Sequence, residues 1–474
     1  MTVKAACKFS TLAIPDQSQL LYGVCPQPLR CGLGLVIGQG VVFPEVNFTL
    51  PPLAITDATW PEVKAHYEQM AEHILRRAVA LSVPGIVLEF ELLPAMTDRP
   101  EWGAEITAIL KCHLVAAHRK YNVPCALRVT PTDIRDQSKP PLMRTGEPWQ
   151  CLRGSLAQCA QAGADILSIE SVGGKEVHDR ALMFGDFPGI VFALGVLAPR
   201  DVAWLWSNIV AICEAHPSVI PGADSACGFA NTAMQLAHQK MLPEVLAAVV
   251  RAMSAVRSLA AFEQGALGPS KDCAYEGPVL KAITGRPISM EGKSASCAHF
   301  SPLGNIAAAM CDLWSNESVQ NVRLLSGNAP EAFTELLAYD CRLMNVAAAS
   351  EGGALRMRDW MTASDEWLSP QAAVLSPAAT IRIAGAIVGE ATPYRQTVAA
   401  GRAALSILND GVAANRLHLS RKELQWLSRI GEALEALPDD EMEFVAAMES
   451  QYGNLYDRAS YGLEPSPATL SRTA

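Results

Sequence analysis

Short apolar runs that read as strands alternate with helical patterns over roughly the first 290 residues. Each run is followed by helical or long loop material, which is the order of elements in a parallel α/β fold. Eight such units are what a (β/α)8 barrel requires, so we predict a TIM-type barrel. The expected strands cover residues 33–37, 85–91, 125–130, 164–170, 190–196, 218–220, 258–263 and 287–290.

Helical patterns separate most of these runs. Pro243 interrupts the last pattern and should kink or split it. The uneven spacing leaves an open doubly wound sheet as the alternative, although no Gly-x-Gly-x-x-Gly follows the first run, as a dinucleotide-binding fold would need. The expected helices cover residues 61–81, 102–121, 149–162, 199–215 and 231–256.

Helical patterns dominate after about Asn316. Ser420 followed by Glu423 predicts a capping box. We expect a helical extension on the barrel, which either only stabilises the fold or also holds a partner. Its helices should cover residues 330–349, 354–367, 370–388, 394–408, 421–437 and 441–451. The expected division is an irregular segment 1–30, a barrel with the zinc site 31–320, a helical extension 321–462 and a flexible tail 463–474.

Composition and charge argue against several classes of protein. Half of the 474 residues are apolar and 18% are charged, which supports a large core rather than disorder. A net charge of −10 without a Lys/Arg-rich run argues against nucleic-acid binding. No uncharged apolar window predicts a membrane span, and the first ten residues lack the apolar region of a signal peptide. Thirteen cysteines without Cys-x-x-Cys pairs predict reduced thiols in the cytoplasm.

Three potential metal ligands, Glu170, Cys227 and Cys273, each follow a strand-like run. A carboxylate and two thiolates that meet at the C-terminal face of a barrel make a three-ligand zinc site with an open fourth position, the catalytic pattern. Their separations of 57 and 46 residues fit neighbouring barrel loops but do not by themselves specify zinc. A single cysteine in a tight loop is more often a small buried residue, so this reading of the two cysteines stays open.

Other residues compete for the same role. Glu89 and Glu91 close an equivalent strand and can replace Glu170 as the carboxylate. Cys297 and His299 form a competing pair, because residues i and i+2 of a strand lie on one face and can contact one metal.

Further motifs occur in a fixed order along the chain. They are Trp102-Gly-Ala-Glu105, Ile166-Leu-Ser-Ile-Glu-Ser-Val-Gly-Gly-Lys-Glu-Val177, Cys227 with Ala230-Asn-Thr-Ala-Met234, Gly268-Pro-Ser-Lys-Asp-Cys-Ala-Tyr-Glu276, Lys281-Ala-Ile-Thr-Gly285, Met290-Glu-Gly-Lys293, Cys297-Ala-His299, Trp314-Ser-Asn-Glu-Ser318, Leu337-Ala-Tyr-Asp-Cys341 and Ala436-Leu-Pro-Asp-Asp440. In this order they resemble the zinc-containing subunit of methanol:corrinoid methyltransferases, over most of the chain.

The resemblance implies a TIM-type barrel with a helical extension, and a zinc ion held by one glutamate and two cysteines. These ligands map onto Glu170, Cys227 and Cys273, whereas Cys297 and His299 become packing or supporting residues. One departure lies before the first zinc cysteine, where the family reads Gly-Asp-Thr-Asp-Cys and this chain reads Gly222-Ala-Asp-Ser-Ala-Cys227. The departure bears on the surroundings of the metal and on the substrate pocket.

The implied reaction moves the methyl group of methanol to the Co(I) of a corrinoid protein, with zinc as a Lewis acid on the leaving oxygen. The chain lacks the Asp-x-His-x-x-Gly pattern that supplies a cobalt-binding histidine, which fits a partner protein that carries the corrinoid. The expected assembly is a cytoplasmic homodimer at the core of a hetero-oligomer, without nucleic acid or membrane.

Three alternative hypotheses about the function remain open. The first is the same chemistry on another small methylated or methoxylated donor. The second is a zinc lyase or hydrolase on the same barrel, which would work without a corrinoid protein. The third is a non-catalytic barrel that docks a corrinoid protein and contains no stoichiometric zinc. The proton donor is not identifiable, although Asp224, Glu263 and Asp272 lie near the ligands in sequence.

Overall fold

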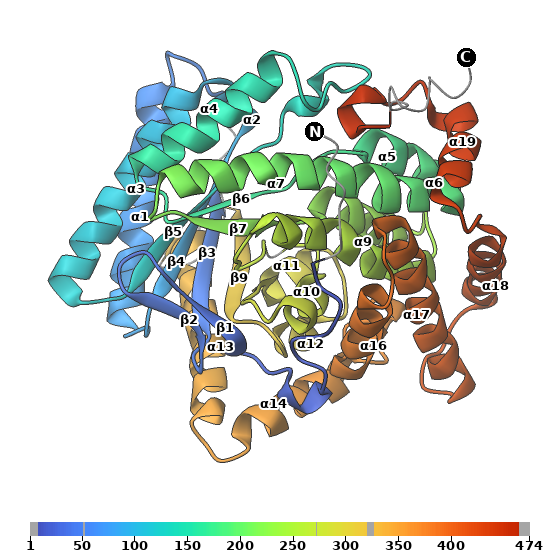
Figure 1. Cartoon of the computed structure of the whole chain (residues 1–474). Coiled ribbons are helices and arrows are strands. Elements are labelled where there is room, and N and C mark those ends of the chain that lie inside the picture. Colours follow the sequence, from blue (N-terminus) through green and yellow to red (C-terminus); the bar gives the residue numbers. More distant parts are fainter. Residues whose placement is uncertain (1–7, 51–52, 272, 320–326, 464–474) are drawn as a thin grey trace.

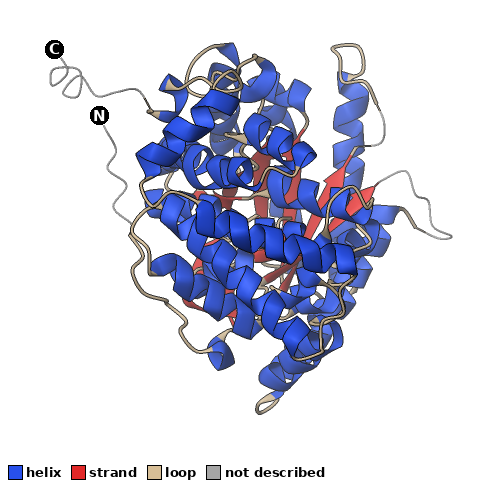
Figure 2. Ribbon diagram, turned by 90° about the vertical axis from the view of Figure 1, so that its right-hand side faces the viewer, coloured by secondary structure: helices blue, strands red, loops and turns tan. Residues whose placement is uncertain are grey.

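A curled parallel sheet forms the centre of the molecule, and helices surround it (Figure 2). The fold is that of a computed structural model, which describes residues 8–50, 53–271, 273–319 and 327–463. In the order of their hydrogen bonds, the strands are β7 (Ile220–Asp224), β6 (Ile166–Ile169), β5 (Cys125–Pro131), β4 (Ile86–Leu92), β3 (Phe43–Thr49), β9 (Leu313–Val319) and β8 (Ser289–Glu291).

The segment 267–271 joins the two ends of this sheet. On one side, the Leu267 amide donates to the Pro221 carbonyl of β7 at 2.7 Å. On the other side, the Ser289 amide of β8 donates to the Ser270 carbonyl at 3.4 Å, and Ser270 forms a parallel bridge with Ile288. The segment therefore occupies the eighth position of a closed ring. The predicted (β/α)8 barrel is confirmed.

Three of the predicted barrel strands are wrong. Residues 33–37 fall largely in β2 (Leu35–Gln39), which pairs antiparallel with β1 (Val24–Cys31) outside the barrel sheet, and β1 itself lies largely in the segment expected to be irregular. Residues 190–196 and 258–263 are helical. Both helical stretches are buried on nearly every side, so their apolar runs carry no helical period and resemble buried strands.

Two barrel strands were missed for the opposite reason. Strand β3 carries Glu45 and Asn47 on its inner side, and β9 carries Ser315 opposite Glu45. The inside of this barrel is polar: the fully buried guanidinium of Arg128 donates to Glu45 Oε1 at 2.6 Å and to Ser168 Oγ at 2.8 Å. A search for apolar runs does not find such strands.

The β1–β2 hairpin closes one end of the barrel. Its tip lies against β5, where the Leu33 amide donates to the Cys125 carbonyl at 2.7 Å. Gly32 has a φ of +52°, and a Cβ at that position would lie 2.4 Å from the same carbonyl oxygen, so only glycine fits. Hairpin and barrel side chains together form an apolar plug at the N-terminal ends of the strands: Cys31, Leu35, Ile37, Phe43, Val87, Ala126, Ile166 and Leu313.

Each strand position is followed by one or more helices. All five predicted helices of the barrel region form, and Pro243 separates α8 from α9 as predicted. The helices are α1 (Trp60–Ala80), α2 (Pro94–Asp98), α3 (Pro100–Tyr121), α4 (Glu147–Ala162), α5 (Lys175–Phe184), α6 (Phe187–Phe192), α7 (Ala198–Ala215), α8 (Thr232–His238), α9 (Glu244–Gln264), α10 (Gly277–Thr284), α11 (Lys293–Ala298), α12 (Gly304–Ala308) and α13 (Ala329–Ala348), with the short turns η1 (Gln17–Gln19), η2 (Arg135–Gln137), η3 (Ala193–Leu197) and η4 (Cys227–Asn231).

The rest of the described chain forms the predicted helical C-terminal region, drawn in orange and red in Figure 1. Helix α17 packs on α9, α16 packs on α10, and α13 packs on β3 and β9 of the barrel. The division at residue 320 stays a prediction, and the expected tail lies, beyond residue 463, outside the described residues. The helices are α14 (Gly353–Asp365), α15 (Pro370–Ala373), α16 (Pro377–Val388), α17 (Pro393–Ala413), α18 (Arg421–Ala436) and α19 (Glu441–Tyr452), followed by η5 (Ala459–Tyr461).

Only half of the predicted capping box forms. The Ser420 hydroxyl accepts from the Glu423 amide at 3.2 Å and caps α18. The Glu423 carboxylate instead accepts from the amides of Glu244 and Val245 at 3.1 and 3.0 Å. It therefore caps the N-terminus of α9 and joins the extension to that barrel helix.

Two helical stretches, Phe187–Ala215 and Glu244–Gln264, are long and apolar enough to cross a membrane by length and composition alone. In their most apolar windows, 83% and 100% of the residues are buried inside the structure. Packing within the fold accounts for their composition, so they give no support for a membrane span.

Candidate metal centre

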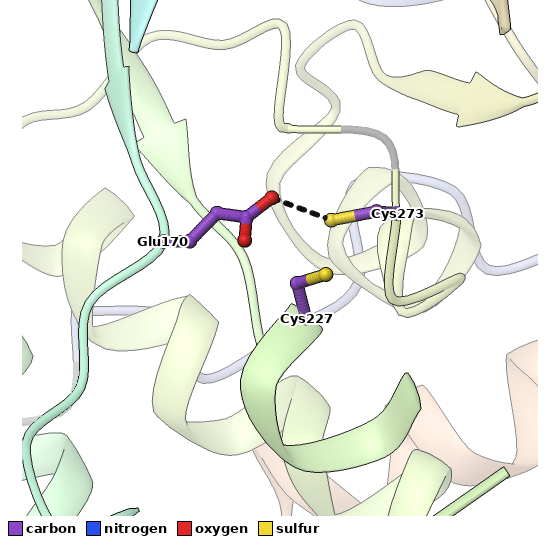
Figure 3. A group of neighbouring side chains, drawn as sticks. All are labelled: Glu170, Cys227 and Cys273. Atoms are coloured by element: carbon purple, nitrogen blue, oxygen red, sulfur yellow. Dashed lines mark hydrogen bonds between the residues drawn. The ribbon is translucent and has the colours of Figure 1, made fainter. Parts of the chain in front are cut away.

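Glu170, Cys227 and Cys273 converge at the C-terminal end of the barrel (Figure 3). Glu170 directly follows β6, Cys227 opens the π-helical turn η4 after β7, and Cys273 lies in the loop between the segment 267–271 and α10. Their ligand atoms all lie within 4.8 Å of one another, and the Cys273 thiol donates to Glu170 Oε1 at 3.0 Å. The structure thus brings together the three residues selected from the sequence.

The donor set fits zinc. Two sulfurs and one carboxylate oxygen are the soft and borderline donors that zinc accepts, whereas Mg²⁺ and Ca²⁺ prefer oxygen alone. Three corners of a tetrahedron with zinc–sulfur bonds of about 2.3 Å lie about 3.8 Å apart, within the span of this cluster. In the described part of the chain, no other group of three such side chains comes together this closely.

The surroundings of the two thiols oppose their ionisation. Its interaction with Cys273 lowers the pKa of Cys227, but burial and the carboxylates of Glu170 and Glu291 raise it, and the net result is a pKa of about 12. Burial, followed by Cys227 and Glu170, raises the pKa of Cys273 well above its ordinary value. A divalent cation would stabilise the two thiolates and offset the negative charge of Glu170 and Glu291, which is compatible with a metal-binding role.

Side chains hold the loop that carries Glu170 from three directions. The Ser171 amide donates to Asp224 Oδ1 at 3.1 Å, and the Val172 amide donates to Asp133 Oδ2 at 3.0 Å. The Gly174 amide donates to the Tyr461 hydroxyl at 2.9 Å, so the last described turn of the C-terminal region contacts this loop. None of these partners is adjacent in sequence to Glu170.

Gly173 in the same loop has no room for a side chain. A Cβ there would lie 2.3 Å from three atoms of Asp201, which Arg135 holds with hydrogen bonds of 3.0 and 2.9 Å. We expect Gly173→Ala to destabilise the protein by about 1–3 kcal/mol and to weaken zinc binding about 10- to 100-fold, because the loop must shift. Unfolding midpoints and competition with a chromogenic chelator measure the two effects.

Gly385→Ala is the matched control, because a Cβ at this position of α16 meets no atom within 4 Å. It should leave zinc binding unchanged and stabilise the helix by up to about 1 kcal/mol. Zinc binding by Gly173→Ala as tight as that of Gly385→Ala would contradict the role given to the loop.

The carboxylate of Glu276 holds the loop that carries Cys227. The Ala226 amide donates to Glu276 Oε1 at 2.8 Å, and the Ser258 hydroxyl of α9 donates to the same oxygen at 2.8 Å. Burial raises the pKa of Glu276. The Asn231 side chain donates to Cys227 Sγ at 3.5 Å.

A buried lysine that the sequence reasoning did not single out lies beside the cluster. Lys271 Nζ lies 2.8 Å from Glu89 Oε1, 2.7 Å from Glu91 Oε1 and 3.6 Å from Glu170 Oε1. Glu89 and Glu91, the alternative carboxylates, bind this lysine and are not members of the three-residue cluster. The Gly-Pro-Ser-Lys-Asp-Cys motif contained the lysine, but nothing in the sequence gave its partners.

The remaining candidates lie elsewhere. Cys297 is exposed, and His299 Nδ1 contacts Gln235 Nε2 at 3.2 Å; neither belongs to the cluster. Among the possible proton donors, Asp224 is fully buried and accepts from Trp206 Nε1 at 2.8 Å. Glu263 lies in the last turn of α9, next to the N-terminal end of the segment 267–271, and Asp272 lies outside the described residues.

Comparisons with known proteins agree with this geometry. A family model described as methanol-cobalamin methyltransferase B subunit matches residues 6–462. A methanol–corrinoid protein co-methyltransferase of Methanosarcina barkeri (strain Fusaro / DSM 804) is 38% identical over 445 residues, which cover 93% of this chain and 95% of that protein. A chain in the crystal structure of the methanol:cobalamin methyltransferase complex MtaBC from Methanosarcina barkeri has a TM-score of 0.92 and 36% identity, over 96% of this chain and 99% of that chain.

Proposed function

The chain belongs to the methanol-cobalamin methyltransferase B subunit family, and from this premise we propose that it transfers the methyl group of methanol to the cobalt of a corrinoid protein. The observation that carries the proposal is the convergence of Glu170, Cys227 and Cys273 at the C-terminal end of the barrel. The C–O bond of methanol breaks, the methyl group bonds to Co(I) of the partner, and the oxygen leaves as water after gaining a proton.

Glu170, Cys227 and Cys273 would hold a zinc ion through one oxygen and two sulfurs. When bound, zinc supplies a Lewis acid that stabilises negative charge on the leaving oxygen. Three anionic ligands outweigh the charge of the ion, and Lys271, 3.6 Å from Glu170, offsets part of that excess. Lys271 is itself held in place by its ion pairs with Glu89 and Glu91.

The corrinoid would reach the cluster from the C-terminal end of the barrel. The β1–β2 hairpin and its apolar plug close the other end, so the methyl acceptor has to approach where the three ligand loops meet. The solved relative is likewise a chain of a methanol:cobalamin methyltransferase complex, MtaBC.

Compartment and assembly belong to the same proposal. The cysteines of the described chain are all free thiols, which supports the cytoplasm as the site of action. A homodimeric core stays a prediction, which light scattering of the purified protein measures.

A methyl-transfer assay with a Co(I) corrinoid protein tests the proposal. We expect methylation of cobalt with methanol as the methyl donor. We also expect the active protein to contain about one zinc ion per chain. Turnover of methoxylated donors but not of methanol would favour the alternative donor. Turnover without a corrinoid protein would favour a zinc lyase or hydrolase. Full methyl transfer by zinc-free protein would contradict the zinc role.

A further inference from the structure

We propose that Arg251, Arg257 and Ser258 of α9 are positioning residues, which together hold the three ligand loops in one arrangement. The inference rests on the metal site proposed above and extends it to side chains that do not touch the metal. Arg257 and Arg251 contact the residues directly after Glu170 and Cys273, whereas Ser258 reaches the residue before Cys227 through Glu276. All three are buried, with exposures of 2% for Arg251 and 0% for Arg257 and Ser258.

Arg257 holds the loop of Glu170. Its Nη2 donates to the carbonyl of Ser171 at 3.2 Å, to the Ser171 hydroxyl, and to Asp224 Oδ1 at 3.0 Å. The same Asp224 oxygen accepts from the Ser171 amide. Arginine and aspartate thus bind the residue directly after Glu170 at its amide, carbonyl and side chain. This fixes the direction in which Glu170 leaves the strand.

Ser258 holds the loop of Cys227 through one intermediate. Its hydroxyl donates to Glu276 Oε1, which also accepts from the amide of Ala226, directly before Cys227. Glu276 itself lies three residues after Cys273. One serine therefore fixes a carboxylate that joins the second and third ligand loops.

Arg251 holds the loop of Cys273. Its Nη1 donates to the carbonyl of Ala274 at 2.5 Å, directly after Cys273, and its guanidinium lies 4.9 Å from the ring centre of Tyr275. Gln371 of α15 fixes the other side of the guanidinium, since it accepts from Arg251 Nε at 2.8 Å. The C-terminal region thus supports this contact as well.

The three candidate ligands are separated by 57 and 46 residues in the sequence. Because side chains of one helix hold all three loops, the loops can keep a fixed geometry relative to one another. Arg251 and Ser258 are seven residues apart, two helical turns, so they lie on the same face of α9, with Arg257 beside them. Buried polar groups on an otherwise apolar helix are costly unless they form hydrogen bonds. The hydrogen bonds of Arg251 Nη1, Arg257 Nη2 and the Ser258 hydroxyl go to the ligand loops or to Glu276, which joins two of them. Partners of this kind tune metal affinity.

Ser258→Ala is the variant that tests the inference, with Ser254→Ala as its matched control. Ser254 lies one turn earlier on the same helix and is equally buried, but its hydroxyl donates to the Val250 carbonyl of its own helix at 2.8 Å. Both substitutions remove one buried hydroxyl, and only one removes a contact to a ligand loop. Arg251→Lys and Arg257→Lys extend the series while keeping the charge.

The readouts are the zinc dissociation constant of the full chain and the thiolate-to-cobalt absorption of its Co²⁺ form. We expect Ser258→Ala to bind zinc about 10- to 100-fold more weakly and to alter the Co²⁺ spectrum, whereas Ser254→Ala retains both wild-type values. Wild-type affinity and spectrum in Ser258→Ala, or equal losses in both variants, would overturn the inference. Wild-type protein that binds no zinc would instead overturn the proposed metal site.

Discussion

Cys227→Ala and Cys273→Ala are each expected to yield folded protein that lacks zinc and transfers methyl groups at about one thousandth of the wild-type rate or less. The Lewis acid contributes several kcal/mol to transition-state stabilisation, and about 4 kcal/mol corresponds to three orders of magnitude. The fold should survive, because the barrel and its hydrophobic core do not depend on this site, in contrast to structural zinc sites. Zinc quantitation, methyl-transfer rates and unfolding midpoints of the two variants measure these effects.

Cys297→Ala is the control for this pair. Cys297 is exposed on α11, outside the cluster, and its thiol is the competing ligand that the sequence left open. The variant should retain full zinc content and activity. Zinc retained at the wild-type level in Cys227→Ala or Cys273→Ala, or lost in Cys297→Ala, would show that the ligands have been assigned wrongly.

Lys271→Met is expected to lower stability by about 3–5 kcal/mol, because it leaves the buried carboxylate of Glu89 and the partly exposed carboxylate of Glu91 without their cation. The side chain of Lys271 is 1% exposed, and its ammonium group lies within 2.8 Å of both Glu89 and Glu91. Chemical denaturation of the metal-free protein is the measurement, since it separates this effect from any loss of zinc.

A double variant tests the cause of that loss. Glu89→Gln removes one of the carboxylates, so Lys271→Met with Glu89→Gln should regain at least about 1 kcal/mol relative to Lys271→Met alone. Lys139→Met is the exposed control: its side chain pairs with Glu176 but is 63% exposed, and its loss should change stability by about 0.5 kcal/mol or less. Equal losses in the buried and the exposed variant would rule out the ion-pair explanation.

The candidate ligands could be predicted from the sequence because of their positions in it. Glu170 directly follows a true strand, and Cys227 and Cys273 stand in loops of small residues after strand-like positions. Parallel strands in a barrel bring such loops together at one end. The predicted number of eight strand-and-helix units was correct, although three of the eight assigned runs are not barrel strands.

The errors arose in two kinds of buried surroundings, one apolar and one polar. The run 258–263 lies in α9, which is buried along its length, so its helical period is invisible in an apolar sequence. Strand β3 was missed because Glu45 and Asn47 face a polar barrel interior rather than an apolar core. A local sequence pattern indicates whether an element has apolar or polar surroundings. It does not indicate which side of the element faces those surroundings.

The contacts around the site could not be predicted from the sequence, because they join distant parts of the chain. Lys271 and Glu91 are 180 residues apart, and Gly174 and Tyr461 are 287 apart. No local pattern encodes pairs at such separations. The sequence therefore predicts the candidate metal ligands, and the fold is needed to find the residues that hold them in place.

X-ray absorption at the zinc edge of the purified protein tests the central claim most directly. The account predicts about one zinc ion per chain, with two sulfur neighbours at about 2.3 Å and oxygen neighbours at about 2.0–2.2 Å. Protein that takes up no zinc, or zinc surrounded by four sulfurs or by imidazole nitrogen, would contradict it.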